Sequence, residues 1–262
     1  NLESLVETPL QLDSSNPAVL EAGLRRYNGI AMVNSVNGKE ENLEAVLPIV
    51  KKYGACVIGL TMGKEIPKEA EGRFQLAEKI VGRAMELGIE KERVFIDCLS
   101  MAASATQEYT AETLYTLSLC QQAGFRTALG VSNVSFGLPE RKIMNSAFLA
   151  MALGRNLDLA IINPLEERMM EAVISARVVM DFDKGCAKYI EYATTKNVEK
   201  TDGAAAPKTA AGTAELSIGE AIVKGLKTEA LSALDGIIAK EGPFGVVDEY
   251  ICLLYTSDAA DE

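Results

Sequence analysis

The chain has 262 residues, 48% of them hydrophobic, so it is long enough to bury a sizeable core. Its formal net charge of −11 would repel phosphate backbones and anionic lipid headgroups, which argues against nucleic acid and membrane partners. Histidine is absent, which rules out a Ser-His-Asp triad and most zinc sites. Any chemistry must therefore use carboxylates, amides or a borrowed cofactor, and we expect no metal site.

As far as about residue 183, short apolar runs typical of buried strands alternate with amphipathic segments. The predicted strands are Pro9–Asp13, Ile30–Ser35, Ala55–Thr61, Val94–Asp97, Thr127–Val131 and Leu159–Ile162. Proline and glycine mark the helices between them, because proline suits a first turn and glycine a helix end. We predict helices beginning at Pro17, Pro67 and Pro139, and helices over Gln107–Ala123 and Leu165–Phe182.

Repeated strand–helix units imply a parallel sheet with right-handed crossovers. Six strands could form an open sheet or part of an eight-stranded barrel. Two observations favour the barrel. Polar residues follow successive strands rather than one switch point, and no GxGxxG or GxxxxGK[ST] turn follows any strand.

The polar residues at the strand ends are Asp13, Asn34, Asp97 and Asn133. Carboxyl ends of parallel strands meet at one edge, where βα barrels build their active sites. A carboxylate can accept two parallel hydrogen bonds, and an amide can donate and accept at once. These side chains therefore suit a flat ligand rich in N–H donors.

Each of these residues also has a purely structural reading. Asp13 could cap the helix that begins at Pro17, and Asn34 precedes a turn. Asn133 could stabilise its own loop, and Asn163 could cap or turn the chain before Pro164. For Asp97, which precedes a long loop of small residues, a structural role is the less favoured reading.

The sequence changes character near its C-terminus. Residues 194–217 are rich in Ala, Thr and Lys and are predicted to be an interdomain linker. Residues 218–251 carry two apolar stripes at helical spacing, and two or three short helices of this kind cannot close a core alone. Residues 252–262 depart from both patterns and are interpreted as a non-native tail.

The composition also bears on the compartment. No apolar run approaches the ~20 residues of a membrane-spanning helix, and no basic segment precedes an apolar one as in a signal peptide. Five scattered cysteines without a CxxC spacing are typical of small buried thiols in a reducing cytoplasm. We therefore expect a cytoplasmic location.

Five separated motifs occur in the order LDSSNPAVLEAGLRRYNGIAMVNSVNG, GACVIGLTM, FIDCLS, LGVSNVSFGLPER and AFLAMALGRNLDLAIINP. Over about residues 8–190 they closely resemble the pterin-binding methyltetrahydrofolate barrel family. That family includes cobalamin-dependent methionine synthase and the methyltransferases that feed corrinoid iron–sulfur proteins. The resemblance implies an α/β fold, with residues 1–193 forming an incomplete TIM (β/α)8 barrel that lacks its first two strands.

By the same resemblance, residues 218–251 look like the start of the helical cap that precedes a cobalamin-binding domain. The order barrel, linker, cap is that of methionine synthase, whereas barrel-only methyltransferases lack the cap. The resemblance implies a module that transfers the N5 methyl of 5-methyltetrahydrofolate to cob(I)alamin, for methionine synthesis from homocysteine. Alternatives are a methyltetrahydrofolate:corrinoid iron–sulfur protein methyltransferase and a non-catalytic pterin-binding module.

The family's residues can be carried over position by position. Asp13, Asn34 and Asp97 match the positions that hold the pterin ring, and Gly130 would let the backbone approach it. Asn133 matches the asparagine that hydrogen-bonds near N5, so the resemblance marks Asn133 and Asp97 as catalytic and all five as pterin-binding.

Cobalamin itself would be carried on a domain outside this chain. The Asp-x-His-x-x-Gly motif that supplies the lower cobalt ligand is absent, as are the homocysteine domain and its zinc cysteines. The expected partners are therefore methyltetrahydrofolate and the cobalamin-binding domain of the same polypeptide. Dihydropteroate synthase is a weaker alternative, because its phosphate-binding Arg/Lys pattern is not found near the last strands.

Overall fold

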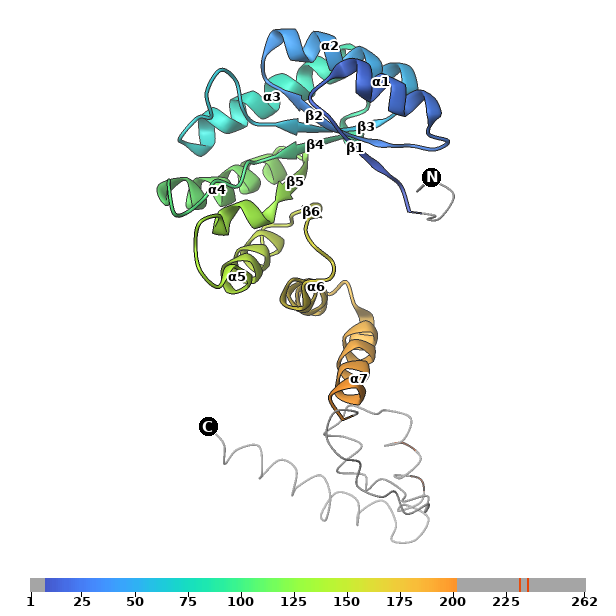
Figure 1. Ribbon diagram of the computed structural model, residues 1–262, viewed down its shortest axis with the longest axis vertical. Coiled ribbons are helices and arrows are strands. Elements are labelled where there is room, and N and C mark those ends of the chain that lie inside the picture. The colour runs from blue at the N-terminus through green and yellow to red at the C-terminus, as the bar shows by residue number, and fades with distance from the viewer. Residues whose placement is uncertain (1–7, 202–230, 232–234, 236–262) are drawn as a thin grey trace. The chain divides into compact units, whose positions relative to one another are not determined.

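A computed structural model describes residues 8–201 together with Leu231 and Asp235 (Figure 1). The strands are β1 (Gln11–Asp13), β2 (Met32–Asn37), β3 (Cys56–Leu60), β4 (Val94–Asp97), β5 (Arg126–Gly130) and β6 (Leu159–Ile161). The α-helices are α1 (Pro17–Arg26), α2 (Glu40–Tyr53), α3 (Ala70–Glu86), α4 (Glu108–Gln122), α5 (Arg141–Leu153), α6 (Glu167–Val179) and α7 (Ala187–Thr201). Short 3-10 helices are η2 (Lys91–Arg93), η3 (Val131–Ser135) and η4 (Lys184–Cys186).

The six strands form one parallel sheet in the order β1-β2-β3-β4-β5-β6. Each strand pairs with the next along the chain, which is the order of a barrel wall and not of a doubly wound sheet. In Figure 1 the helices α1 to α5 flank the same side of a curved sheet. The chain therefore has an α/β fold with a parallel half-barrel, and a lack of two further strands stays a prediction.

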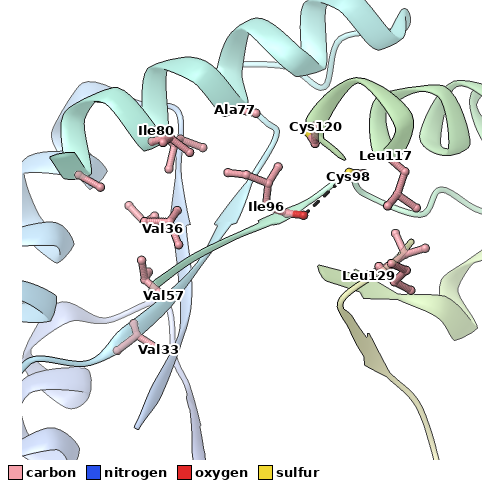
Figure 2. Close-up of a cluster of buried hydrophobic side chains, with 14 of the residues drawn as sticks. Val33, Val36, Val57, Ala77, Ile80, Ile96, Cys98, Leu117, Cys120 and Leu129 are labelled. Atoms are coloured by element: carbon pink, nitrogen blue, oxygen red, sulfur yellow. Dashed lines mark hydrogen bonds between the residues drawn. The ribbon is translucent and has the colours of Figure 1, made fainter. Parts of the chain in front are cut away.

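The core lies between the sheet and these helices. Figure 2 shows Val33, Val57, Ile96 and Leu129 from four strands, with Ile80 of α3 facing the sheet; all five are inaccessible to solvent. Strands covered on their helical side and packed within a barrel wall lose the alternation of polar and apolar residues. This is why the strands are visible in the sequence as continuous apolar runs.

The helix starts differ in how well the sequence predicts them. Helix α1 begins at Pro17 as predicted, and its cap is Asn16, whose Oδ1 accepts from the backbone N–H of Ala18 at 2.9 Å. Pro67 does not begin a helix: α3 starts at Ala70, whose N–H donates to the carboxylate of Glu112 in α4 at 2.8 Å.

Two further helix boundaries need correction. Pro139 does not begin α5, because Glu140 adopts a left-handed φ of 47° and the helix starts only at the next residue. Helix α6 begins and ends inside the predicted Leu165–Phe182. Residue Asp181 has a left-handed φ of 62°, which stops the helix before its predicted end.

The predicted linker 194–217 begins with ordered helix, because α7 continues through Thr194 to Thr201. Lys196 in this helix forms ion pairs with Glu167 and Glu171 of α6. The remainder of the linker, the predicted cap over 218–251 and the tail over 252–262 lie outside the described residues, apart from Leu231 and Asp235. Within the described part of the chain, no helix has the length and apolar character needed to cross a bilayer.

Candidate active site

The carboxyl ends of the strands lie along one edge of the sheet, because all six strands are parallel. The β2–β3 register shifts between Asn34 and Val36, so Asp97 is level with Asn37 of β2 and not with Asn34. Asp13 is directly opposite Asn34 in the β1–β2 pair, and Asp97 is opposite Leu60 in the β3–β4 pair. Two strand spacings separate β2 from β4, about 10 Å at ~4.8 Å per strand. Side chains from both places can therefore reach one flat bicyclic ligand.

Asp13 and Asn34 form a pair at the first of these places. The Nδ2 of Asn34 donates to Oδ2 of Asp13 at 3.2 Å, and the Asp13 side chain remains exposed. The capping role that Asp13 could have had belongs to Asn16, as described above. The Asp13 carboxylate is thus oriented by a neighbour and still open to a ligand.

Asp97 is the buried carboxylate of the site, with only 8% of its surface exposed. The backbone N–H of Leu99 donates to its Oδ1 at 2.8 Å. Burial raises the pKa of Asp97 to about 6, and the backbone N–H groups of Leu99 and Gly130 offset part of that rise. The group is therefore mostly ionised at neutral pH, in a water-poor place where hydrogen bonds are strong.

Asn133 lies in η3, directly after β5, and its side chain is exposed. A Cβ atom added to Gly130 would have the Nδ2 of Asn133, at 3.9 Å, as its nearest neighbour. Among the described residues, no hydrogen-bond partner faces the Asn133 amide. The side chain is therefore not used to close its own turn, which the backbone does through the N–H of Phe136.

Arg141 stabilises that turn from α5. Its Nη2 donates to the carbonyl of Ser132 at 2.8 Å and its Nε to Oγ of Ser135 at 2.9 Å. The turn is also joined to the loop after β4, where the N–H of Ala103 donates to the carbonyl of Val134 at 2.9 Å. The segment that carries Asn133 is thus held against the loop that follows Asp97.

Asn163, the other asparagine at a strand end, has a local role. Its Oδ1 accepts from the backbone N–H of Leu165 at 3.0 Å, and its carbonyl accepts from the N–H of Glu166. These bonds shape the turn that leads into α6, whose N-cap is Glu166, so the turn alternative is the one the structure supports.

Sequence reasoning did not single out Arg73, although it lies beside the site. The sequence feature that could have revealed it is its position. Arg73 is a charged residue at the helical spacing of the apolar stripe of α3, which continues through Ala77, Ile80 and Ala84. Periodicity alone would assign that position to the core, and the structure does bury it completely. The spacing could not show which groups the guanidinium contacts.

Residues 1–163 match the family described as pterin binding enzyme, so the chain belongs to that family. It is 28% identical over 193 residues to the methylcorrinoid:tetrahydrofolate methyltransferase of Eubacterium limosum, covering 72% of this chain and 71% of that protein. It is 31% identical over 170 residues to the methionine synthase of Mycobacterium tuberculosis, covering 59% of this chain.

The lengths of these relatives differ greatly. The chain spans only 14% of the M. tuberculosis methionine synthase and 15% of the one from Mycobacterium leprae. Among solved structures it resembles Yersinia pestis DHPS (TM-score 0.55, 18% identity, 69% of this chain and 72% of that one). It also resembles dihydropteroate synthase from Xanthomonas albilineans with 7,8-dihydropteroate (TM-score 0.55, 21% identity, 68% and 70%), and at these identities the likeness establishes the fold alone.

Proposed function

We propose that the chain is the methyltetrahydrofolate-binding methyltransferase module of a cobalamin-dependent methionine synthase, transferring the N5 methyl group to cob(I)alamin. The observation that carries the proposal is the line of polar side chains from β1, β2, β4 and η3 along one edge of the sheet, in a chain of the pterin binding family. The similarity to proteins named as methyltransferases supports the reaction class.

The pterin would bind through its 2-amino-4-oxo pyrimidine edge. Asp97 accepts hydrogen bonds from the N–H donors of that edge, and Asp13 and Asn34 complete the set from β1 and β2. Because Asp97 is buried, its carboxylate has already lost most of its water, so little solvent must be reorganised when the ligand arrives. The N–H of Leu99 keeps that carboxylate in one orientation.

Asn133 would act on the leaving nitrogen. N5 first takes up a proton from solvent, because a neutral tertiary amine is a poor leaving group. Cob(I)alamin, as second substrate, then takes the methyl carbon, the carbon–nitrogen bond breaks with its electron pair going to N5, and the product is neutral tetrahydrofolate with that proton on N5. The Asn133 carbonyl oxygen accepts a hydrogen bond from protonated N5, which favours the protonated form from which the methyl group can leave. Its amide is available for this because no described residue binds it.

Cobalamin enters as a second substrate presented by another domain. The chain contains no histidine, so its residues do not fit a site that would supply a histidine ligand to cobalt. This chain's own part is to bind and orient the folate and to hold the proton at N5.

A second candidate is a methyltetrahydrofolate:corrinoid iron–sulfur protein methyltransferase. The observation that favours it is the similarity to the E. limosum enzyme, which extends over 71% of that shorter protein. The two candidates share the pterin site and differ only in the protein that presents the corrinoid. A module that binds pterin without catalysis is the third.

The test uses the 262-residue chain with methyltetrahydrofolate, first by calorimetry and then in an anaerobic cuvette with cob(I)alamin, whose visible absorption reports its methylation. We expect binding, and methyl transfer faster than without the chain. Faster transfer to a methionine synthase cobalamin domain than to a corrinoid iron–sulfur protein supports the first candidate, and the reverse order supports the second. Binding without transfer identifies a non-catalytic module, and absence of binding contradicts all three.

Affinity for methyltetrahydrofolate should depend on pH through Asp97. A protonated carboxyl group offers one acceptor fewer to the pterin, so binding requires the ionised form. With the pKa of Asp97 at about 6, affinity should be nearly constant above pH 7 and fall about tenfold per unit well below pH 6. Calorimetry from pH 5 to pH 8 measures the affinity. In Asp97→Asn the affinity should no longer depend on pH in this range.

Gly130→Ala should weaken ligand binding without affecting the stability of the fold. Apart from Asn133 Nδ2 at 3.9 Å, an added methyl group at Gly130 would meet open space, so the variant should be as stable as the parent. The methyl would occupy the position of the ring, and affinity should fall about tenfold. Gly59→Ala is the contrast, since its Cβ would lie 2.8 Å from Ile80 and should lower the thermal midpoint.

A further inference from the structure

Arg73 is a charged residue in the core of the molecule. It belongs to α3, its side chain lies between that helix and the loop after β4, and it is completely buried. Burial lowers the pKa of its guanidinium group below the usual value. Among the described residues it forms no ion pair, and its Nη2 has no hydrogen-bond partner. Burying a charge in this way costs free energy of folding, which points to a role other than stability.

The donors of Arg73 are directed at backbone carbonyls. Nη1 donates to the carbonyls of Cys98 at 3.1 Å and Leu99 at 3.3 Å, and also to Oγ1 of Thr113 at 2.9 Å. Nε donates to the carbonyl of Pro67 at 2.9 Å. The guanidinium thus joins the start of α3, the loop after β4 and helix α4.

Leu99 is the residue through which this network reaches the site. Its φ is 57°, in the left-handed region that a leucine rarely adopts, so the conformation needs outside support. Both Arg73 and the Thr113 hydroxyl hold its carbonyl, the latter at 2.9 Å. The N–H of the same residue donates to Oδ1 of Asp97 at 2.8 Å.

We propose that Arg73 is a positioning residue that fixes the Asp97 carboxylate for pterin binding by holding the backbone of Leu99. The inference rests on the proposed function and extends it to a residue that does not touch the ligand. The titratable groups around the network are Cys98 in the loop, and Tyr109 and Glu112 of α4, which face the guanidinium. None of them replaces the hydrogen bonds to the two carbonyls.

The test compares Arg73→Lys and Thr113→Val with the parent chain. Lysine keeps the charge but lacks the planar fork of donors, and its three N–H groups share one nitrogen atom, so it cannot reach the Pro67 carbonyl and the carbonyls of Cys98 and Leu99 together. Methyltetrahydrofolate affinity should fall about tenfold. The pH midpoint of binding should rise by about one unit, because the Leu99 N–H would no longer lower the pKa of Asp97. Thr113→Val should shift both quantities in the same direction by less.

Hydrogen–deuterium exchange supplies a second measurement that needs no ligand. Amides of residues 98–106 should exchange faster in Arg73→Lys, with the remaining peptides unchanged. Arg83→Lys is the matched control: it lies on the same helix about 15 Å away, where it pairs with Glu44 and Glu86, and should change neither quantity.

The outcomes separate this inference from the proposed function. An unchanged pH midpoint together with unchanged exchange in residues 98–106 would show that Arg73 only fills space, even if binding weakens. If the parent chain binds no methyltetrahydrofolate, the proposed function fails, while the exchange experiment still decides whether Arg73 holds the loop.

Discussion

Asp97→Asn is expected to weaken methyltetrahydrofolate binding about 100-fold, since it removes two hydrogen bonds to a charged acceptor in a buried place. The asparagine side chain keeps the shape of the carboxylate, so packing should not change. Its amide would point a donor toward donors of the pterin, which adds an unsatisfied contact. Calorimetry at pH 7.5, where the parent Asp97 is ionised, measures the loss directly.

The same substitution should make the folded chain more stable at pH 7. The pKa of Asp97 is raised from 3.8 to about 6 on folding, so between these pH values the folded chain binds a proton that the unfolded chain does not. The destabilisation is therefore fully present above pH 6 and gone below pH 3.8, and amounts to about 3 kcal/mol. Loss of one acceptor costs asparagine about 1 kcal/mol, which leaves a net gain of about 1–2 kcal/mol in urea unfolding.

Asp158→Asn provides the opposite pattern as a control. Asp158 precedes β6, at the other end of the strands, and accepts from the N–H and hydroxyl of Thr127 at 2.8 and 3.0 Å and from Gln121 at 2.7 Å. Its loss should lower stability and leave pterin affinity unchanged. If Asp97→Asn behaved in the same way as Asp158→Asn, Asp97 would be a structural carboxylate and the proposed site would be wrong.

Asn133→Ala should slow methyl transfer to cob(I)alamin by about 100- to 1,000-fold, the effect of removing one well-placed polar contact to developing charge. The hydrogen bond forms only after N5 is protonated for reaction, whereas methyltetrahydrofolate binds with neutral N5, so its affinity should change less than about threefold. Single-turnover absorption measurements give the rate, and calorimetry gives the affinity. A large loss of rate with little loss of affinity identifies a role in the transition state.

Asn163→Ala is the matched control for this experiment. It is also an asparagine at a strand end, but its side chain is already bonded to the N–H of Leu165. Transfer rates should stay close to those of the parent chain. Equal losses in the two variants, or a loss of affinity in Asn133→Ala as large as the loss of rate, would contradict a transition-state role for Asn133.

Most of the sheet could be predicted from local sequence, because buried parallel strands are continuous apolar runs whose limits are marked by turn residues. β4 agrees with its prediction residue for residue, and the other strands differ by one or two residues at their ends. Pro17 correctly predicted the start of α1, because the preference for proline in a first turn depends only on neighbouring residues. The polar residues at the strand ends were visible for the same local reason.

Two of the errors, at Pro67 and in the predicted linker, occurred where a distant segment contacts the local structure. Pro67 has the sequence position of a helix start, but the first free N–H of α3 is satisfied by Glu112, which is more than forty residues away. Helix α2 carries Pro48 in its interior, so its extent could not be inferred from proline rules. The residues from Thr194 to Thr201 lack large apolar side chains, yet they are helical, and Lys196 among them pairs with Glu167 and Glu171 of α6.

Local pattern and residue type were thus enough to identify the strands, their parallel order and the side chains that follow them. The tertiary structure alone decided which of those side chains are free, which are buried and what orients them. The burial that raises the pKa of Asp97 and the contact from Arg73 through Leu99 both come from packing α3 and α4 against β4. Desolvation and hydrogen-bond geometry depend on neighbours in space, and no spacing along the chain encodes them.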